Sequence, residues 1–149
     1  MTKRLIETRS AIETMEAGRE LAGQLSGGDV VLLSGDLGAG KTTFAQGIAR
    51  GLGVRGPVQS PTFTLIAEYD APQIGPGALF VHVDLYRLDG APDVESIGFE
   101  EYLDRDDVVT VVEWPERASV GLFPDHWSAD IALREDDLRQ IAVTEPRHG

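Results

Sequence analysis

The sequence predicts an α/β fold: a mainly parallel sheet sandwiched by helices, with a C-terminal antiparallel hairpin. Two observations support this prediction. Residues 29–34, 78–83 and 108–112 form short apolar runs, which are typical of strands buried on both faces of a parallel sheet. Segments with helical spacing alternate with these strands, which favours a layered α/β arrangement. A chain of 149 residues is expected to form one domain, over residues 1–149.

The chain is expected to begin with an edge strand at Arg4–Thr8, followed by a helix. Ser10 and Glu13 have the spacing of a capping box, which marks a helix start. Gly27 and Gly28 are expected to end that helix, because glycine readily adopts the left-handed conformation of a helix end. Its buried face is expected to carry Ile12, Met15, Leu21, Ala22 and Leu25.

The middle of the chain alternates strands with connecting segments. A helix is expected over about residues 42–52, with Gly53 as its stop. The β-rich residues 62–69 predict a strand, and residues 70–77, with two prolines and two glycines, predict a surface loop.

The last third of the chain is expected to contain a short helix over residues 93–103, before the buried strand at 108–112. Apolar residues at 131–133 and 138–144 flank an acidic turn, which predicts the antiparallel hairpin.

The composition excludes several classes of protein. There is no cysteine, and His82, His126 and His148 are too scattered to indicate a histidine metal site. The net charge of −12 argues against a free-standing nucleic-acid binder, because such binding depends on bringing Lys and Arg to phosphates. Neither an apolar run of the ~20 residues needed to cross a bilayer nor a signal peptide is present, so a cytoplasmic protein is expected.

A phosphate-binding loop is the strongest motif in the chain. Gly35-Asp36-Leu37-Gly38-Ala39-Gly40-Lys41-Thr42 fits the pattern G-x-x-x-x-G-K-[ST] between a buried strand and a helix. Glycines let backbone N–H groups point at phosphates, Lys41 supplies a mobile charge, and Thr42 offers a hydroxyl to Mg²⁺. The motif predicts a P-loop NTPase that binds ATP and Mg²⁺. The expected nucleotide-binding residues are Leu37, Gly38, Ala39, Gly40, Lys41, Thr42 and Thr43.

Two acids stand at the ends of predicted core strands. Ligands bind at the carboxyl ends of strands in an open parallel sheet, where Asp84 and Glu113 are expected. Either acid can hold Mg²⁺ or orient the attacking water, so both are candidate catalytic residues together with Lys41. Trp114 follows Glu113, and either walls the nucleotide pocket or fills the edge of the core.

Ser60-Pro61-Thr62 follows the helix of the phosphate loop, at the place where a GTPase-like switch puts a threonine on Mg²⁺. A simple proline turn into the next strand explains the same residues.

The nucleotide class follows from what the sequence lacks. The chain contains no asparagine, so a guanine-reading Asn-Lys-x-Asp loop is excluded. A small-molecule kinase is the main alternative to an ATPase. The eleven arginines are spread out, which counts against a kinase lid that clamps the transferred phosphate.

Several motifs, in this order, resemble the TsaE (YjeE) family, the P-loop ATPases of bacterial tRNA threonylcarbamoyladenosine biosynthesis. The resemblance covers about residues 35–116, the family's leading helix fits residues 10–25, and the tail after Pro124 matches weakly. The matching motifs are Gly35-Asp36-Leu37-Gly38-Ala39-Gly40-Lys41-Thr42-Thr43, Ser60-Pro61-Thr62-Phe63-Thr64-Leu65, His82-Val83-Asp84-Leu85-Tyr86-Arg87-Leu88, Ile97-Gly98-Phe99-Glu100-Glu101-Tyr102-Leu103 and Glu113-Trp114-Pro115-Glu116.

The resemblance implies that Thr42 and Glu113 hold Mg²⁺, that Asp84 supports water or metal, and that residues 60–62 form the switch-like segment. It also implies that the N-terminal segment contributes to the adenine pocket, without indicating which residue does so. The expected partner is the TsaB–TsaD complex, which transfers the threonylcarbamoyl group to tRNA, while ATP use by the TsaE protein serves the cycle of the assembly.

Overall fold

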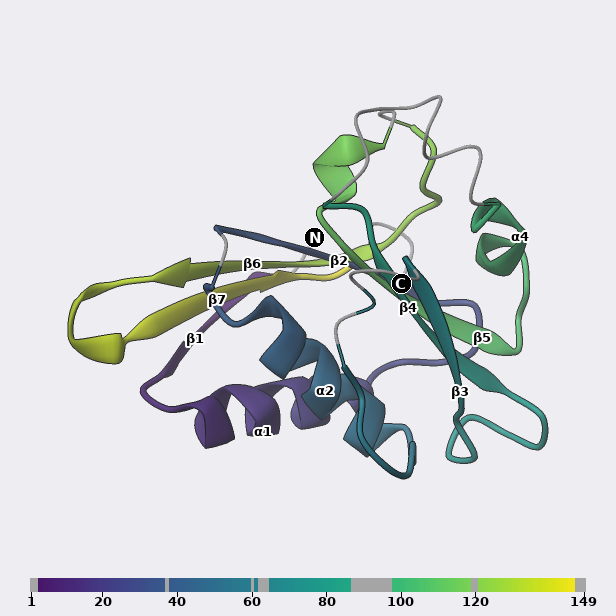
Figure 1. The fold of residues 1–149 in the computed structure, drawn as a ribbon, viewed down its shortest axis with the longest axis horizontal. Helices are drawn as coiled ribbons and strands as arrows, with labels where there is room; N and C mark the ends of the chain where they lie inside the picture. The colour runs from purple at the N-terminus through teal and green to yellow at the C-terminus, as the bar shows by residue number, and fades with distance from the viewer. Residues whose placement is uncertain are drawn as a thin grey trace.

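One seven-stranded sheet runs through the protein in the computed structural model, which describes residues 3–36, 38–59, 61, 65–86, 98–118 and 121–146 (Figure 1). The strands lie in the order β1-β7-β6-β2-β5-β4-β3. Their bounds are β1 Lys3–Thr8, β2 Val30–Gly35, β3 Ile66–Asp70, β4 Leu79–Asp84, β5 Val108–Glu113, β6 Trp127–Leu133 and β7 Arg139–Thr144.

The centre of the sheet is parallel and its margins are antiparallel. β2 pairs in parallel with β5 on one side and β6 on the other, and β4 extends the parallel part beyond β5. β3 is antiparallel to β4 at one margin, and β7 and β1 follow β6 in antiparallel order at the other. The predicted fold class and the C-terminal hairpin are therefore confirmed, although β6 begins at Trp127, four residues before the predicted strand.

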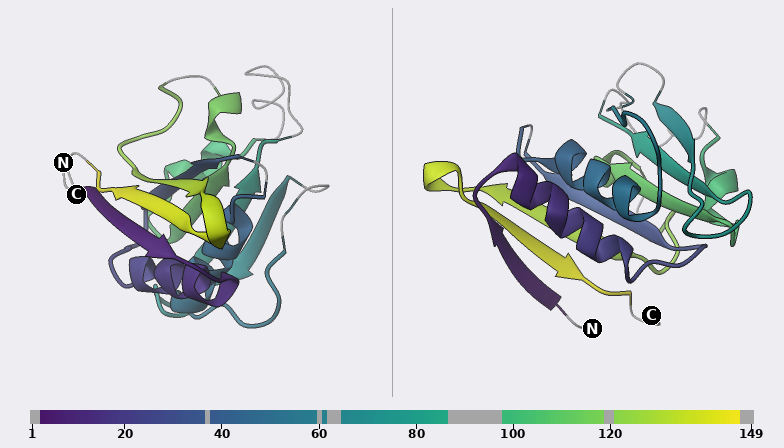
Figure 2. Two further views of the ribbon diagram at one scale, coloured as in Figure 1. Left: turned by 90° about the vertical axis from the view of Figure 1, so that its left-hand side faces the viewer. Right: turned by 90° about the horizontal axis from the view of Figure 1, so that it is seen from below.

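Two long helices, α1 (Ala11–Ala22) and α2 (Lys41–Gly51), cover one face of the sheet side by side (Figures 1 and 2). They pack against each other through glycines. A Cβ atom at Gly47 would lie 1.9 Å from the Met15 carbonyl oxygen, and one at Gly18 would lie 2.2 Å from the Phe44 carbonyl oxygen. Backbones this close leave no room for a side chain, so the two helices hold each other in a fixed position.

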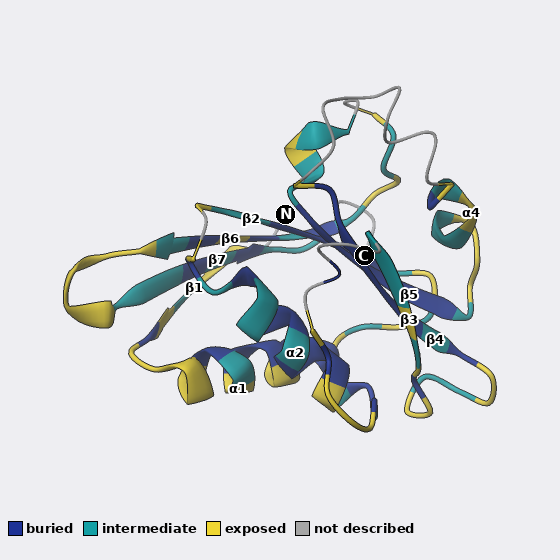
Figure 3. Ribbon diagram, viewed as in Figure 1, coloured by how far each residue is buried: buried dark blue, intermediate teal, exposed yellow. Residues whose placement is uncertain are grey.

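The opposite face is covered by the short helix α4 (Glu100–Leu103) and by the segments around it. Phe99 is fully buried there, against Leu32, Val83 and Val112 of the central strands. Figure 3 shows how burial concentrates in the parallel strands and on the sheet-facing sides of α1 and α2. None of the described helices is both long and apolar enough to span a bilayer.

The buried face of α1 differs from the prediction. Ser10 caps the helix as expected, because its side chain accepts a hydrogen bond from the Glu13 N–H. Ile12, however, is 77% exposed, which contradicts its placement on the buried face. Leu21 and Ala22 are buried as predicted, and the other buried positions are Thr14, Ala17 and Gly18. This face has mostly small side chains because α2 approaches it so closely, whereas the prediction followed the large apolar residues.

The ends of other helices and strands also differ from the predicted ones. α1 ends at Ala22 with Gly23 as its cap, and Gly27 and Gly28 lie in the turn before β2. α2 ends close to the predicted position, and Gly53 follows with a φ of 87°, in the left-handed region. β3 begins at Ile66, whereas residues 62–64 of the predicted strand lie outside the described residues, as do residues 93–97 of the predicted helix.

Candidate functional site

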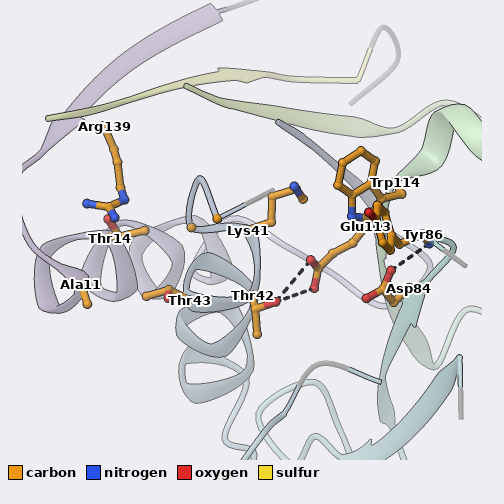
Figure 4. Close-up of a pocket in the computed structure, with 12 residues that line it drawn as sticks. Ala11, Thr14, Lys41, Thr42, Thr43, Asp84, Tyr86, Glu113, Trp114 and Arg139 are labelled. Carbon is orange, nitrogen blue, oxygen red and sulfur yellow. Dashed lines mark hydrogen bonds between the residues drawn. The ribbon is translucent and has the colours of Figure 1, made fainter. Parts of the chain in front are cut away.

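A cavity of about 390 Å³ opens where the parallel strands end and α2 begins (Figure 4). This is the edge at which ligands bind in open α/β sheets. The cavity draws its lining from α1, the phosphate loop, α2, β4, β5 and β7. The lining residues are Ala11, Thr14, Gly38, Gly40, Lys41, Thr42, Thr43, Asp84, Tyr86, Glu113, Trp114 and Arg139.

The loop between β2 and α2 forms the floor of this cavity. Gly38 and Gly40 have φ values of 81° and 114°, a region that side chains disfavour, so glycine is needed at both positions. Ala39 between them is buried. The N-terminus of α2 follows directly, which adds backbone N–H groups and the positive end of the helix dipole. Leu37, also predicted to bind nucleotide, lies outside the described residues.

Lys41 is buried at this end of the cavity, with 4% of its surface exposed. Its Nζ donates hydrogen bonds to the Gly35 and Asp36 carbonyl oxygens, at 2.6 and 3.0 Å. The same ammonium lies 4.2 Å from the centre of the Trp114 ring, within the range of a cation–π contact. Burial lowers the pKa of Lys41, and the charges of the surrounding acids, Glu113 first among them, oppose that shift.

Glu113 stands at the end of β5 and contacts two side chains. The Thr42 hydroxyl donates toward its carboxylate, 3.3 Å from Oε1 and 3.2 Å from Oε2 (Figure 4). On the other side, His82 Nε2 lies 2.6 Å from Oε2. Glu113 is only 3% exposed, so the protein holds this carboxylate in place from both sides.

Asp84 stands opposite Glu113 in the pairing of β4 with β5. It is 6% exposed, and its Oδ1 accepts a hydrogen bond from the Tyr86 N–H at 3.0 Å. The structure thus places both predicted strand-end acids on one cavity, next to the phosphate loop.

Trp114 lies at the border between the cavity and the apolar core. It lines the cavity, and it also packs against the apolar cluster on the α4 side of the sheet. Its ring centre lies 4.8 Å from that of Tyr86. The backbone of Trp114 has a φ of 60°, which is uncommon for a residue with a side chain and stores strain at this wall of the cavity.

Although the family resemblance implied a contribution from the N-terminal segment to the adenine pocket, no individual residue at the opposite end of the cavity was predicted from the sequence. Ala11 and Thr14 reach it from α1 and Arg139 reaches it from β7, far from the phosphate loop in the chain. Arg139 Nε donates a hydrogen bond to the Ala39 carbonyl oxygen at 3.1 Å, which ties the C-terminal hairpin to the loop. No local motif marks these residues, because only the order of the strands brings β7 close to α1 and α2.

The predicted switch-like segment is described only at Pro61, since Ser60 and Thr62 lie outside the described residues. Pro61 is buried, and its carbonyl oxygen accepts a hydrogen bond from the Leu65 N–H at 2.7 Å. A switch at residues 60–62 therefore remains a prediction.

With the site in view, comparison with known proteins decides the family. The sequence model of the family described as "Threonylcarbamoyl adenosine biosynthesis protein TsaE" matches residues 8–141. The chain belongs to the TsaE family. The match extends from the end of β1 into β7, so it includes β6 and the first half of β7, in the tail whose sequence resembled the family weakly.

Individual TsaE proteins show the same relation. The chain is similar to the tRNA threonylcarbamoyladenosine biosynthesis protein TsaE of Streptomyces coelicolor, with 45% identity over 87% of this chain and 88% of the relative. The protein of the same name from Bacillus subtilis is 39% identical, over 89% of this chain and 79% of the relative. Among solved structures, YdiB of Bacillus subtilis superimposes with a TM-score of 0.79 and 32% identity, covering 99% of this chain and 88% of YdiB.

Proposed function

We propose that this TsaE-family protein is an ATPase of the tRNA N6-threonylcarbamoyladenosine machinery. It binds ATP and Mg²⁺ in the cavity and acts with the TsaB–TsaD complex in the cytoplasm. The observation that carries the proposal is the meeting of Lys41, Thr42, Asp84 and Glu113 at one end of the cavity, beside the N-terminus of α2. We call these four residues the phosphate end.

The phosphate end suits a nucleotide with its metal ion. Mg²⁺ prefers hard oxygen ligands, and proteins commonly hold it through one or two side chains together with phosphates and water. Within the described part of the chain, no cluster of three or more acidic or histidine side chains is placed to hold a metal alone. The Thr42 hydroxyl and the Glu113 carboxylate are 3.2–3.3 Å apart and supply such oxygens side by side. When bound, Mg²⁺ would neutralise charge on the phosphate oxygens.

The other residues of the phosphate end have distinct roles in this proposal. Lys41 contacts the β- and γ-phosphates, for which it exchanges its bonds to the loop carbonyls. Asp84 orients the water that attacks the terminal phosphate, or supports the metal through water. Trp114 walls the cavity above the Lys41 ammonium and keeps bulk water from it.

Ala11, Thr14 and Arg139 form what we call the adenosine end of the cavity. The Thr14 hydroxyl is hydrogen-bonded to the Thr8 hydroxyl, 2.7 Å away, so its methyl-bearing side presents a fixed surface. The planar Arg139 guanidinium suits stacking or hydrogen bonding with an adenine or ribose. We propose that this end receives the adenosine.

The charge of the protein bears on its partners. At −12, its surface repels RNA phosphates, so binding of bare tRNA by this chain alone is expected to be weak. We propose that the TsaB–TsaD complex holds the tRNA. Hydrolysis by the isolated protein is expected to be slow, because a partner's arginine can raise the rate of a P-loop enzyme by ~10³–10⁵.

The experiment is to measure ADP release by the purified protein alone, with the TsaB–TsaD complex, and with a panel of small hydroxyl compounds. The proposal expects slow release alone and faster release with the complex. A small-molecule kinase would instead release ADP in step with phosphorylation of one compound, and that result would replace the ATPase assignment. Fast hydrolysis by the isolated protein would contradict the dependence on partners.

A further inference from the structure

His82 is a buried polar residue beside the phosphate end, and the proposed function does not use it. It lies in β4, two residues before Asp84, so both side chains point to the same face of the sheet. None of its surface is exposed. Its Nε2 lies 2.6 Å from Oε2 of Glu113, on the neighbouring strand.

Only one of the two ring nitrogens of His82 has a hydrogen-bond partner among the described residues. An ionised carboxylate only accepts hydrogen bonds, so the hydrogen of this contact belongs to His82 Nε2. Nδ1, the other ring nitrogen, is buried without a hydrogen-bond partner among the described residues. The ring of Phe80 lies nearby, with its centre 6.2 Å from that of the imidazole. A buried polar group without a partner costs stability. Packing therefore does not account for a histidine at this position, whereas its bond to Glu113 does.

That bond determines how the Glu113 carboxylate is presented. His82 holds Oε2 from the sheet side, and the Thr42 hydroxyl contacts both oxygens from α2. With Oε2 engaged by the ring, rotation of the carboxylate is restricted and both of its oxygens stay beside the Thr42 hydroxyl. These are the two groups that the proposed function assigns to Mg²⁺.

We propose that His82 is a positioning residue: its Nε2–H fixes the Glu113 carboxylate in the orientation that receives the Mg²⁺ of the bound nucleotide. The inference rests on the proposed nucleotide site. Carboxylates that ligate metals are commonly held by such hydrogen bonds, and losing one typically lowers metal affinity about 10- to 100-fold. His82 touches neither nucleotide nor metal in this arrangement and acts only through Glu113.

The test measures ADP binding by calorimetry across a range of Mg²⁺ concentrations, which needs no turnover. In the proposed site, Mg²⁺ increases the affinity for ADP. For His82→Leu, the Mg²⁺ concentration that gives half of this increase should rise about 10- to 100-fold. Binding of ADP without Mg²⁺ should stay at the wild-type level, because Lys41 and the loop are unchanged. His82→Gln places an amide N–H close to the position of Nε2 and should recover part of the Mg²⁺ response.

Phe80→Leu is the matched control, because it removes packing from the same face of β4 without touching Glu113. If Phe80→Leu weakens the Mg²⁺ response as much as His82→Leu, or if His82→Leu leaves it unchanged, the positioning role is wrong. Should His82→Leu not fold, the His82→Gln titration and nitrogen NMR of the wild-type ring decide. A hydrogen on Nε2 supports the proposal, and a neutral ring carrying its hydrogen on Nδ1 overturns it.

The same data separate this inference from the proposed function. If wild-type protein fails to bind ADP with or without Mg²⁺, the nucleotide site itself is wrong. If wild-type protein shows Mg²⁺-dependent binding that His82→Leu does not alter, only the role of His82 fails.

Discussion

The two ends of the cavity are built in different ways. At the phosphate end, Lys41, Asp84 and Glu113 are at most 6% exposed, and each is held by hydrogen bonds to the backbone or to neighbouring side chains. At the adenosine end, Thr14 is buried, but Ala11 is exposed and Arg139 is half-buried. The phosphate end is therefore a set of charged groups that hydrogen bonds hold in place without a ligand. The adenosine end is a more open surface, formed by elements that come together only in the folded protein.

This difference suggests that one end of the cavity sets the affinity for a polyphosphate and the other sets the selectivity for the group attached to it. Fixed charges and backbone N–H groups stabilise any polyphosphate with its metal ion, whatever base it carries. Under the proposed function, selection for adenosine is expected to come from the more open end of the cavity, which Ala11, Thr14 and Arg139 line. The following predictions test that division, starting with the largest effect.

Chemistry should depend on the acids of the phosphate end. Glu113→Gln, which still offers His82 an acceptor, and Asp84→Ala should each lower ATP turnover with partners about 10²-fold or more, because orientation of water and charge placement act in the transition state. Nucleotide binding should remain measurable. Turnover assays would compare both with Glu135→Ala, an exposed acid of the hairpin turn. If both variants hydrolyse ATP at the wild-type rate, neither acid takes part in the reaction.

Lys41→Ala should weaken binding of every polyphosphate. The loss of a charge-assisted contact of about 1.5–3 kcal/mol corresponds to about a tenfold to hundredfold loss of affinity. Calorimetry should show this loss for ATP and for inorganic triphosphate alike. Lys3→Ala, which removes the only other lysine, is the control and should bind normally. Normal ATP binding by folded Lys41→Ala would refute the placement of the site.

Arg139→Ala should have a smaller and more selective effect. Losing one guanidinium contact is expected to cost about fivefold to tenfold in ATP affinity. Inorganic triphosphate, which does not reach the adenosine end, should bind as before. Arg134→Ala, an exposed arginine of the same hairpin, serves as control. An equal loss for triphosphate would show that Arg139 acts through its bond to the loop at Ala39 and not through adenosine.

Ser10→Ala should have the smallest effect. The variant removes the N-cap of α1, the helix that carries Ala11 and Thr14, and should lower the free energy of unfolding by about 1 kcal/mol. Denaturant unfolding would measure it. ATP affinity should change little, because the contact of α1 with α2 at Gly18 and Gly47 still places the helix. A large loss of affinity would mean that the helix cap itself shapes the adenosine end.

The same division explains what the sequence predicts well. The phosphate end comes from residues 35–42 and from two acids that follow apolar β-branched runs, so local patterns mark it before the fold is known. The central strands are predictable for the same reason. The adenosine end depends on β7 lying beside β6 and β1, and no local pattern encodes the order of strands.

Two particular residues show the limits of such patterns. Ile12 was wrongly placed in the core because large apolar side chains usually lie inside, whereas the contact of α1 with α2 selects small ones. The sequence did not predict a role for His82, because a single histidine within an apolar strand has no spacing that indicates a partner. Its contact with Glu113 exists only through the pairing of β4 with β5.

The pairing of β1 with β7 also has a consequence for folding during synthesis on the ribosome. β1 is made before β7, and their pairing joins Lys3 to Thr144, with the other described strands of the sheet between them in the sequence. Long-range pairings of this kind form late, because a large loop must close first. Until β7 is made, β1 lacks the one strand that pairs with it in the described part of the chain, and Arg139 is not yet present beside α1. A nascent chain that lacks β7 therefore lacks Arg139, so one end of the cavity is incomplete until synthesis reaches this strand.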